Sequence, residues 1–453
     1  MIGNAQAVPM SLQEQSNQNE FCDRRTHLSR RTLLGAGGGG ILMSSIARRL
    51  AWADEQGVTD AAKPKSVILL WLQGGPSQLE TFDPHPGGMY GGDASAIDTS
   101  VKGLQISDLL PQTAEQMHLA SLIRSVTSKE GDHERAIYNA KTGFRPDPTL
   151  IHPSIGSVIC HQMNQEQDRL VDIPRHISIL PSKTPGRGGY LGDQFDAFKV
   201  FDPVQPIPDV AARVETKRQL SRLEKLKFAD QQFLKNRGNN SIIGESLKSS
   251  NLDAAIRLMS SDQLNAFDVS QVSESERAQF GDTPFGRSCL AALRLIETGV
   301  RCVEVTLTGW DSHVNNHETQ AGRINILDPA YASLIKELKK RDLLDSTMVV
   351  CGGEFGRTPW INPLGGRDHW PHGFSIALAG GGIQGGRVIG ETDPNPKRES
   401  APKASLKQPH PIEDVHATVF SAMGIEFETE LDTPIGRPMK ICEGKPVQAL
   451  LDV

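Results

Sequence analysis

The 453-residue sequence lacks long apolar runs, a basic excess and a high aromatic content. No stretch reaches the roughly 20 apolar residues that a membrane-spanning helix needs. The 48 basic residues are outnumbered by 54 acidic ones, and the net charge of −6 argues against a nucleic-acid or anionic-lipid partner. Aromatic residues make up only 5%, whereas 43 glycines and 28 prolines indicate a loop-rich, enzyme-like domain. With 38% hydrophobic residues, disorder, coiled coil and collagen are excluded.

Cysteine is also scarce, and its spacing excludes several kinds of site. The six cysteines include no C-x-x-C pair, and Cys289, Cys302 and Cys351 lie within apolar segments. This pattern predicts buried free thiols, since disulfide frameworks are expected mainly in small secreted domains. The missing C-x-x-C-H motif excludes a c-type haem, and we expect no nucleotide cofactor.

The first 53 residues have the organisation of an export signal. Ser29-Arg30-Arg31 precedes a short, glycine-rich apolar stretch, and Ala51-Trp52-Ala53 forms an A-x-A cleavage site. The paired arginines indicate the bacterial twin-arginine route, so we expect the twin-arginine export machinery as a partner and a periplasmic or extracellular location. Removal of residues 1–53 takes away six basic and three acidic residues, which leaves a mature chain 54–453 with a net charge of −9.

Strands and helices are predicted to alternate along the mature chain. Four apolar runs predict strands buried on both faces: Ser66–Leu72, Cys302–Leu307, Thr347–Cys351 and Ser375–Ala379. Three periodic segments predict helices: Arg287–Glu297, Pro329–Leu343 and Glu413–Met423. This alternation predicts an α/β fold with a mainly parallel sheet between helices. Such sheets place their chemistry at the carboxyl ends of the strands.

One charged segment does not fit the alternation. Residues 210–236 carry leucines and phenylalanines at helical spacing among many charges. We interpret the region of about 210–260 as a helical insertion whose role is packing.

The first candidate site follows the strand Cys302–Leu307 directly. Asp311, His313 and His317 lie within seven residues there, and a carboxylate with two imidazoles is a ligand set for Zn²⁺ or Mn²⁺. The next strand ends in Glu354 within a glycine turn, and Arg357 follows as a candidate partner for an anion.

Two further clusters complete the candidate set. Asp368, His369 and His372 lie between glycines just before the last apolar strand, where three ligand-type side chains in five residues indicate a site. Upstream, Asp132 and His133 precede a predicted helix. The start of that helix would either bind an anion through its free amides, or Asp132 would serve only as its N-cap.

These features together resemble the alkaline phosphatase superfamily of metal-dependent phosphate and sulfate ester hydrolases. Within it they resemble the exported branch known as domain of unknown function 1501 (DUF1501), over essentially the whole mature chain. The motifs that carry the resemblance are Gly74-Gly75-Pro76-Ser77, Glu80-Thr81-Phe82-Asp83-Pro84, Thr142-Gly143, His152-Pro153-Ser154-Ile155-Gly156, Gly309-Trp310-Asp311-Ser312-His313, Gly353-Glu354-Phe355-Gly356-Arg357-Thr358 and Asp368-His369.

The resemblance assigns roles to individual positions. It implies that Asp311 binds a first metal ion with His313 or His317 and with His369 or His372. Asp368 belongs to the same candidate set of metal ligands. Glu354 falls at the position of a second-metal aspartate. Three departures stand beside these matches: Gln73 replaces an aspartate, Phe355 replaces a histidine, and His133 stands where the nucleophilic serine or threonine belongs.

These departures alter the expected mechanism. A covalent phospho-enzyme lacks its attacking hydroxyl, and the Cys/Ser-x-Pro-x-Arg signature of formylglycine sulfatases is missing. We therefore predict an exported hydrolase of a phosphate or sulfate ester that uses attack by water, with His133, Glu354 and Arg357 as catalytic residues and Zn, or else Mn, Ca or Fe, as the metal. His133 would act either as a general base toward a metal-bound water or as a metal ligand itself. The expected substrate is an anionic ester, either a small molecule or a polymer. The alternative is a catalytically degenerate binding or assembly module that retains the fold.

Overall fold

The chain is described by a computed structural model, which covers residues 66–163, 171–205, 207, 210, 214–235, 255–397 and 406–451. All of these residues fall within one compact unit, Thr59–Val453. The predicted signal peptide, residues 1–53, and part of the predicted insertion lie outside the described residues. Among the described residues, no helix is both long and apolar enough to cross a membrane.

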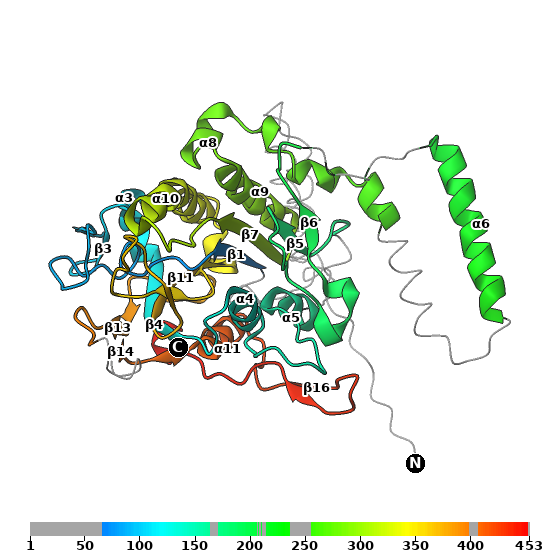
Figure 1. Ribbon diagram of the computed structural model, residues 1–453. Coiled ribbons are helices and arrows are strands. Elements are labelled where there is room, and N and C mark those ends of the chain that lie inside the picture. Colours follow the sequence, from blue (N-terminus) through cyan, green and yellow to red (C-terminus); the bar gives the residue numbers. More distant parts are fainter. Residues whose placement is uncertain are drawn as a thin grey trace, which may run out of the picture. The chain divides into compact units, whose positions relative to one another are not determined.

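The central element is a nine-stranded sheet (Figure 1). Its order is β12-β4-β11-β8-β1-β7-β5-β6, and β15 also pairs with β4. Only β11 runs antiparallel to its neighbours, so the sheet is mostly parallel, as the sequence predicts. The strands are β1 (Ser66–Gln73), β4 (Ala120–Thr127), β5 (His176–Ile179), β6 (Phe198–Val200), β7 (Cys302–Thr308), β8 (Thr347–Gly352), β11 (Phe374–Gly380), β12 (Val388–Ile389) and β15 (His410–Pro411).

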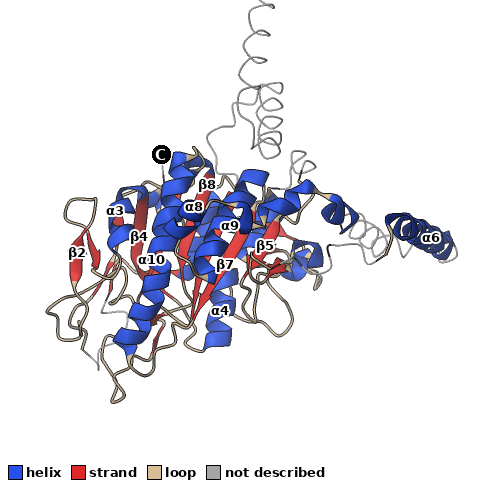
Figure 2. Cartoon of the chain, turned by 90° about the horizontal axis from the view of Figure 1, so that it is seen from above, coloured by secondary structure: helices blue, strands red, loops and turns tan. Residues whose placement is uncertain are grey.

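Helices cover both faces of this sheet. The principal helices are α3 (Pro111–Gln116), α4 (His133–Thr142), α5 (Ile155–Gln162), α9 (Pro284–Thr298), α10 (Asn316–Lys340) and α11 (Ile412–Ala422). Figure 2 shows α9 and α10 lying across the strands on one face. Their buried side chains share a core with Ile68 and Leu70 of β1, whereas those of α4, α5 and α11 share a second core with Val67 and Trp71. Alternate residues of one strand therefore supply both cores.

The four predicted strands are confirmed as β1, β7, β8 and β11. Two of the three helices match closely: α9 ends at Gly299, which adopts a left-handed conformation with φ of 104°, and α11 ends before Gly424. The expected start of the third helix at Pro329 is wrong, because α10 begins at Asn316 and carries this proline in its interior. Helix α6 (Thr216–Lys235) lies within the predicted insertion.

The five cysteines of the described residues are all buried, as predicted: Cys160, Cys289, Cys302, Cys351 and Cys442. Of these, Cys289, Cys302, Cys351 and Cys442 are free thiols. Burial raises the pKa of the Cys289 and Cys302 thiols well above their usual value, so these groups are poor nucleophiles.

Candidate metal centre

One edge of the sheet gathers the polar segments. The parallel strands β1, β4, β7 and β8 all end there, and each is followed by a loop. Because β11 runs the opposite way, the segment that precedes it reaches the same edge. This segment contains β10 (His369–Trp370), which pairs with β9 (Gly356–Arg357) so that His369 lies opposite Arg357.

Helix α4 delivers His133 to this edge. The Asp132 side chain accepts hydrogen bonds from the Glu134 and Arg135 amides, so it caps the helix and His133 becomes the first helical residue. Of the two predicted roles of this turn, anion binding and N-capping, the structure shows N-capping by Asp132. The Asp132 carboxylate already accepts hydrogen bonds from the amides that a bound anion would need.

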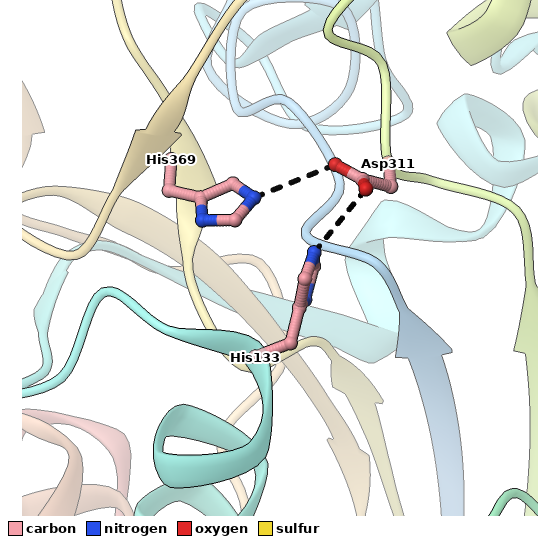
Figure 3. A group of neighbouring side chains, drawn as sticks. All are labelled: His133, Asp311 and His369. Carbon is pink, nitrogen blue, oxygen red and sulfur yellow. Dashed lines mark ion pairs between the residues drawn. The ribbon is translucent and has the colours of Figure 1, made fainter.

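His133, Asp311 and His369 form a compact group in which each residue offers one ligand atom, and these atoms all lie within 4.8 Å of one another. The three side chains come from α4, the loop after β7 and β10, and they point toward one another (Figure 3). His133 Nε2 lies 3.4 Å from Asp311 Oδ2, and His369 Nε2 lies 3.5 Å from Asp311 Oδ1.

A third imidazole joins this group. His313 Nε2 lies 3.2 Å from Asp311 Oδ1 and 3.0 Å from His369 Nε2. Of the alternatives predicted from the sequence, the structure thus brings His313 and His369 to Asp311. His317 falls in the first turn of α10, and His372 packs edge-on against Trp370.

Each of the three imidazoles is oriented through its other nitrogen. His133 Nδ1 donates to Glu354 Oε1, His313 Nδ1 donates to Asp368 Oδ1, and His369 Nδ1 donates to the Gly131 carbonyl, all at 2.8 Å. Since carboxylates and carbonyls only accept, each Nδ1 carries a proton, and the three Nε2 atoms face Asp311. This is the outer-shell arrangement that orients metal-binding histidines.

The spacing of the group suits a metal ion. A tetrahedral ion with bonds of about 2.0–2.2 Å keeps its ligand atoms about 3.3–3.5 Å apart. Asp311 Oδ1 lies 3.2 Å from His313 Nε2 and 3.5 Å from His369 Nε2, and the other carboxylate oxygen, Oδ2, lies 3.4 Å from His133 Nε2. In addition, His133 Nε2 and Glu354 Oε2 are buried and have no hydrogen-bond partner among the described residues. Orphaned buried polar atoms are costly, so a cation would relieve them.

Asp368 is the carboxylate that orients His313. Asp368 is about half exposed and binds His313, which lowers the pKa of its carboxyl. Asn362, which no sequence motif singled out, also binds this pair. Its amide donates to Asp368 Oδ1 at 3.2 Å and to the His313 carbonyl at 3.0 Å.

The hydrogen bond to Glu354 raises the pKa of His133 and outweighs burial, which acts in the opposite direction. For Asp311, burial acts to raise the pKa, but the bond and charge of Arg357 and the nearby histidines leave it lowered. Burial lowers the pKa of His369 and therefore favours its neutral form. A neutral imidazole beside an ionised carboxylate is the protonation state that metal binding requires.

Arg357 does not have the surroundings of an anion-binding residue. Its side chain is 0% exposed, and its guanidinium donates to Asp311 Oδ1 at 2.7 Å. The remaining bonds go to the carbonyls of Gly74, Gly75 and Arg367. The predicted contact with a substrate anion is therefore replaced by contacts inside the protein.

Phe355 and Gly74 contact residues of the centre from segments distant in sequence: Phe355 packs against His133 and His369, and Gly74 binds Glu354. The ring centroid of Phe355 lies 5.0 Å from that of His133 and 4.5 Å from that of His369, so an apolar ring packs against both imidazoles. Gly74 has φ of 119°, and its amide donates to Glu354 Oε1. A Cβ on Gly74 would lie 2.6 Å from the Asp311 amide, so only glycine allows this approach of β1 to the loop after β7.

Comparison with protein families gives one match. The profile of the family described as "Protein of unknown function (DUF1501)" matches residues 64–451, which include every residue of the centre. No curated protein matches the sequence.

Several solved structures are similar at low identity. PsFucS1 sulfatase from Pseudoalteromonas sp. is 10% identical with a TM-score of 0.36, over 85% of this chain and 72% of that one. The C-terminal periplasmic domain of EcEptC from Escherichia coli, in complex with Zn, is 10% identical with a TM-score of 0.32, over 71% and 74%. A protein of the alkaline phosphatase superfamily from Vibrio parahaemolyticus is 14% identical with a TM-score of 0.34, over 80% and 67%.

Proposed function

The chain belongs to the DUF1501 family of proteins of unknown function, and from that premise we propose that it is an exported, metal-dependent hydrolase of anionic phosphate or sulfate esters. The observation that carries this proposal is the convergence of three imidazole Nε2 atoms on the Asp311 carboxylate. The twin-arginine segment within residues 1–53 supports export.

The metal would be held by His133, Asp311, His313 and His369. Three imidazoles with one carboxylate suit Zn²⁺ best, with Mn or Fe next, and suit Ca²⁺ least because calcium prefers oxygen ligands. A bound divalent cation supplies Lewis-acid polarisation of an ester oxygen and lowers the pKa of a neighbouring water.

The protein's own groups prepare this centre. Glu354, Asp368 and the Gly131 carbonyl each hold a proton on Nδ1 of one imidazole, which keeps its Nε2 available. In the described part of the chain, no serine, threonine or cysteine side chain hydrogen-bonds to His133, Asp311 or His369. We therefore assign the attack to water rather than to a side-chain hydroxyl.

Arg323 is the group that we assign to the substrate anion in place of Arg357. Arg323 lies on α10 and packs against Gly309, which precedes Asp311 by two residues. A Cβ added to Gly309 would lie 3.3 Å from the Arg323 guanidinium. Arg323 is partly exposed and has no ion pair or side-chain hydrogen bond with another described residue. An unpaired guanidinium beside a cation site suits a phosphate or sulfate group.

A metal and activity assay tests the proposal. The mature protein, purified without a chelating tag, is expected to retain about one equivalent of metal and to hydrolyse a member of a panel of phosphate monoesters, phosphate diesters and sulfate esters. The D311N variant should lose both properties. H161N, which changes a histidine that packs against Phe195, is the matched control and should keep them. A wild-type protein that binds no metal after loading would refute the proposal.

A second candidate is a binding module without turnover, favoured by one observation. Phe355 packs against both imidazoles at a position where the superfamily resemblance implies a polar ligand. The same assay distinguishes the two, because this alternative predicts bound metal and bound ester with no hydrolysis of any ester in the panel.

A further inference from the structure

Arg357 places a fixed positive charge inside the centre. Its backbone is fastened on both sides by Gln78, whose side-chain amide donates to the Arg357 carbonyl at 2.8 Å and whose oxygen accepts from the Arg357 amide at 2.9 Å. The guanidinium is held by the carbonyls of Gly74, Gly75 and Arg367. With these contacts and no exposure, the side chain has no room to swing into solvent.

Among the described residues, the only ion pair of this guanidinium is with the carboxylate of Asp311. Arg357 Nη2 lies 2.7 Å from Asp311 Oδ1, the same oxygen that faces His313 and His369. The carbonyl groups that hold Arg357 are dipoles and do not cancel its charge. Asp311 is therefore shared between a permanent cation and the imidazoles.

A second metal ion beside the first would need ligands that the centre does not provide. Two buried oxygens of the segments that end at this edge of the sheet have no hydrogen-bond partner among the described residues, Glu354 Oε2 and Gln73 Oε1. The other Glu354 oxygen already accepts from Gly74 and His133. Two oxygens fall short of the four or more ligands that a bound divalent ion requires, and like charges repel strongly at this range.

We infer that the centre binds a single metal ion per chain, and that the buried guanidinium of Arg357 supplies the positive charge that a second ion would otherwise bring. This inference rests on the proposed function, because it presupposes that a metal binds at Asp311. It makes Arg357 a positioning residue, since the side chain does not reach the surface and acts through Asp311.

The number of ions per chain tests the inference. The mature protein is stripped with a chelator, titrated with Zn²⁺ alone by calorimetry and then analysed for metal by mass spectrometry. One equivalent per chain is expected. Two equivalents, or two anomalous-scattering peaks in a crystal, would overturn the inference and leave the proposed function standing. No bound ion would overturn both.

Two substitutions at Arg357 separate its charge from its packing. R357K keeps a charge and is expected to leave the Zn²⁺ dissociation constant within about threefold. R357M removes the charge at similar length, and loss of the repulsion should tighten Zn²⁺ binding by about tenfold or more. Weaker binding in a folded R357M would show that Arg357 serves only to hold Asp311. If R357M does not fold, the stoichiometry of the wild-type protein still decides.

Discussion

The histidines of the centre are distinguished by what their second ring nitrogen does. His133, His313 and His369 each donate from Nδ1 to an oxygen and present Nε2 to Asp311. A histidine at this edge of the sheet without such an acceptor is less well oriented as a ligand.

Paired substitutions test this selection. We expect H313N and H369N to weaken Zn²⁺ binding by at least about 100-fold, because each removes an oriented ligand. H317N and H372N, which change neighbours of the same residue type, should leave it within about threefold. Competition with a chromophoric chelator measures all four constants. Loss of binding in H317N with retention in H313N would reverse the assignment.

Substitution of Arg323 tests its proposed contact with the substrate anion. R323Q should raise KM for an anionic ester by about tenfold or more, since it removes a charged bond to the substrate, while the Zn²⁺ affinity stays unchanged. R323K should recover part of the loss. If instead kcat falls and KM does not change, Arg323 does not hold the ground-state anion.

At the scale of elements, the turn after β1 decides how closely the strand ends approach. Gly74 and Gly103 both have positive φ, but an added Cβ meets the Asp311 amide in the first case and open space in the second. G74A should therefore lower the free energy of unfolding by about 3 kcal/mol or more and abolish metal binding, whereas G103A should cost about 1 kcal/mol. Urea denaturation with a metal titration checks both, and equal effects would show that backbone strain alone is responsible.

Much of the element-level organisation could be predicted from the sequence, because strands buried on both faces are continuous apolar runs and their polar ends are easily recognised. The choice between His313 and His317 could not. It depends on where α10 begins. Asn315 is a residue type that favours N-caps, but it adopts a left-handed conformation and its side chain does not cap the helix, so the usual capping geometry does not mark this boundary.

The burial of Arg357 could not be predicted for a different reason. Arginine is rarely fully buried, and two of the three carbonyls that make its burial tolerable, those of Gly74 and Gly75, come from a segment distant in sequence. Likewise, the register of β9 with β10 selects His369 rather than His372, and that register depends on tertiary pairing.

At the scale of the whole molecule, three buried histidines couple stability to pH. Burial lowers the pKa of His152, His176 and His416, which lie outside the metal centre. Below about pH 6.5 the unfolded chain binds protons at these positions and the folded chain does not, so stability falls as pH decreases.

The fall between pH 7.5 and pH 5.5 is expected to reach at most about 1.4 kcal/mol for each group, the limit set by one pH unit below the ordinary histidine pKa. Urea denaturation of the metal-free protein at the two pH values measures it. H416Q, in which the amide can still donate to the Ala140 carbonyl that His416 Nε2 contacts, should show a smaller dependence. An unchanged dependence in H416Q would exclude His416 as its source.

The position of β1 in the sheet also sets the timing of folding. This first strand lies between β7 and β8, and its Ser66 hydroxyl donates to the Val300 carbonyl, 234 residues away. During synthesis at about 5–20 residues per second, β1 therefore waits on the order of ten seconds or more before either neighbour exists. The polypeptide must keep its most apolar strand from premature association until its C-terminal half has emerged, and the centre at the strand ends is completed only then.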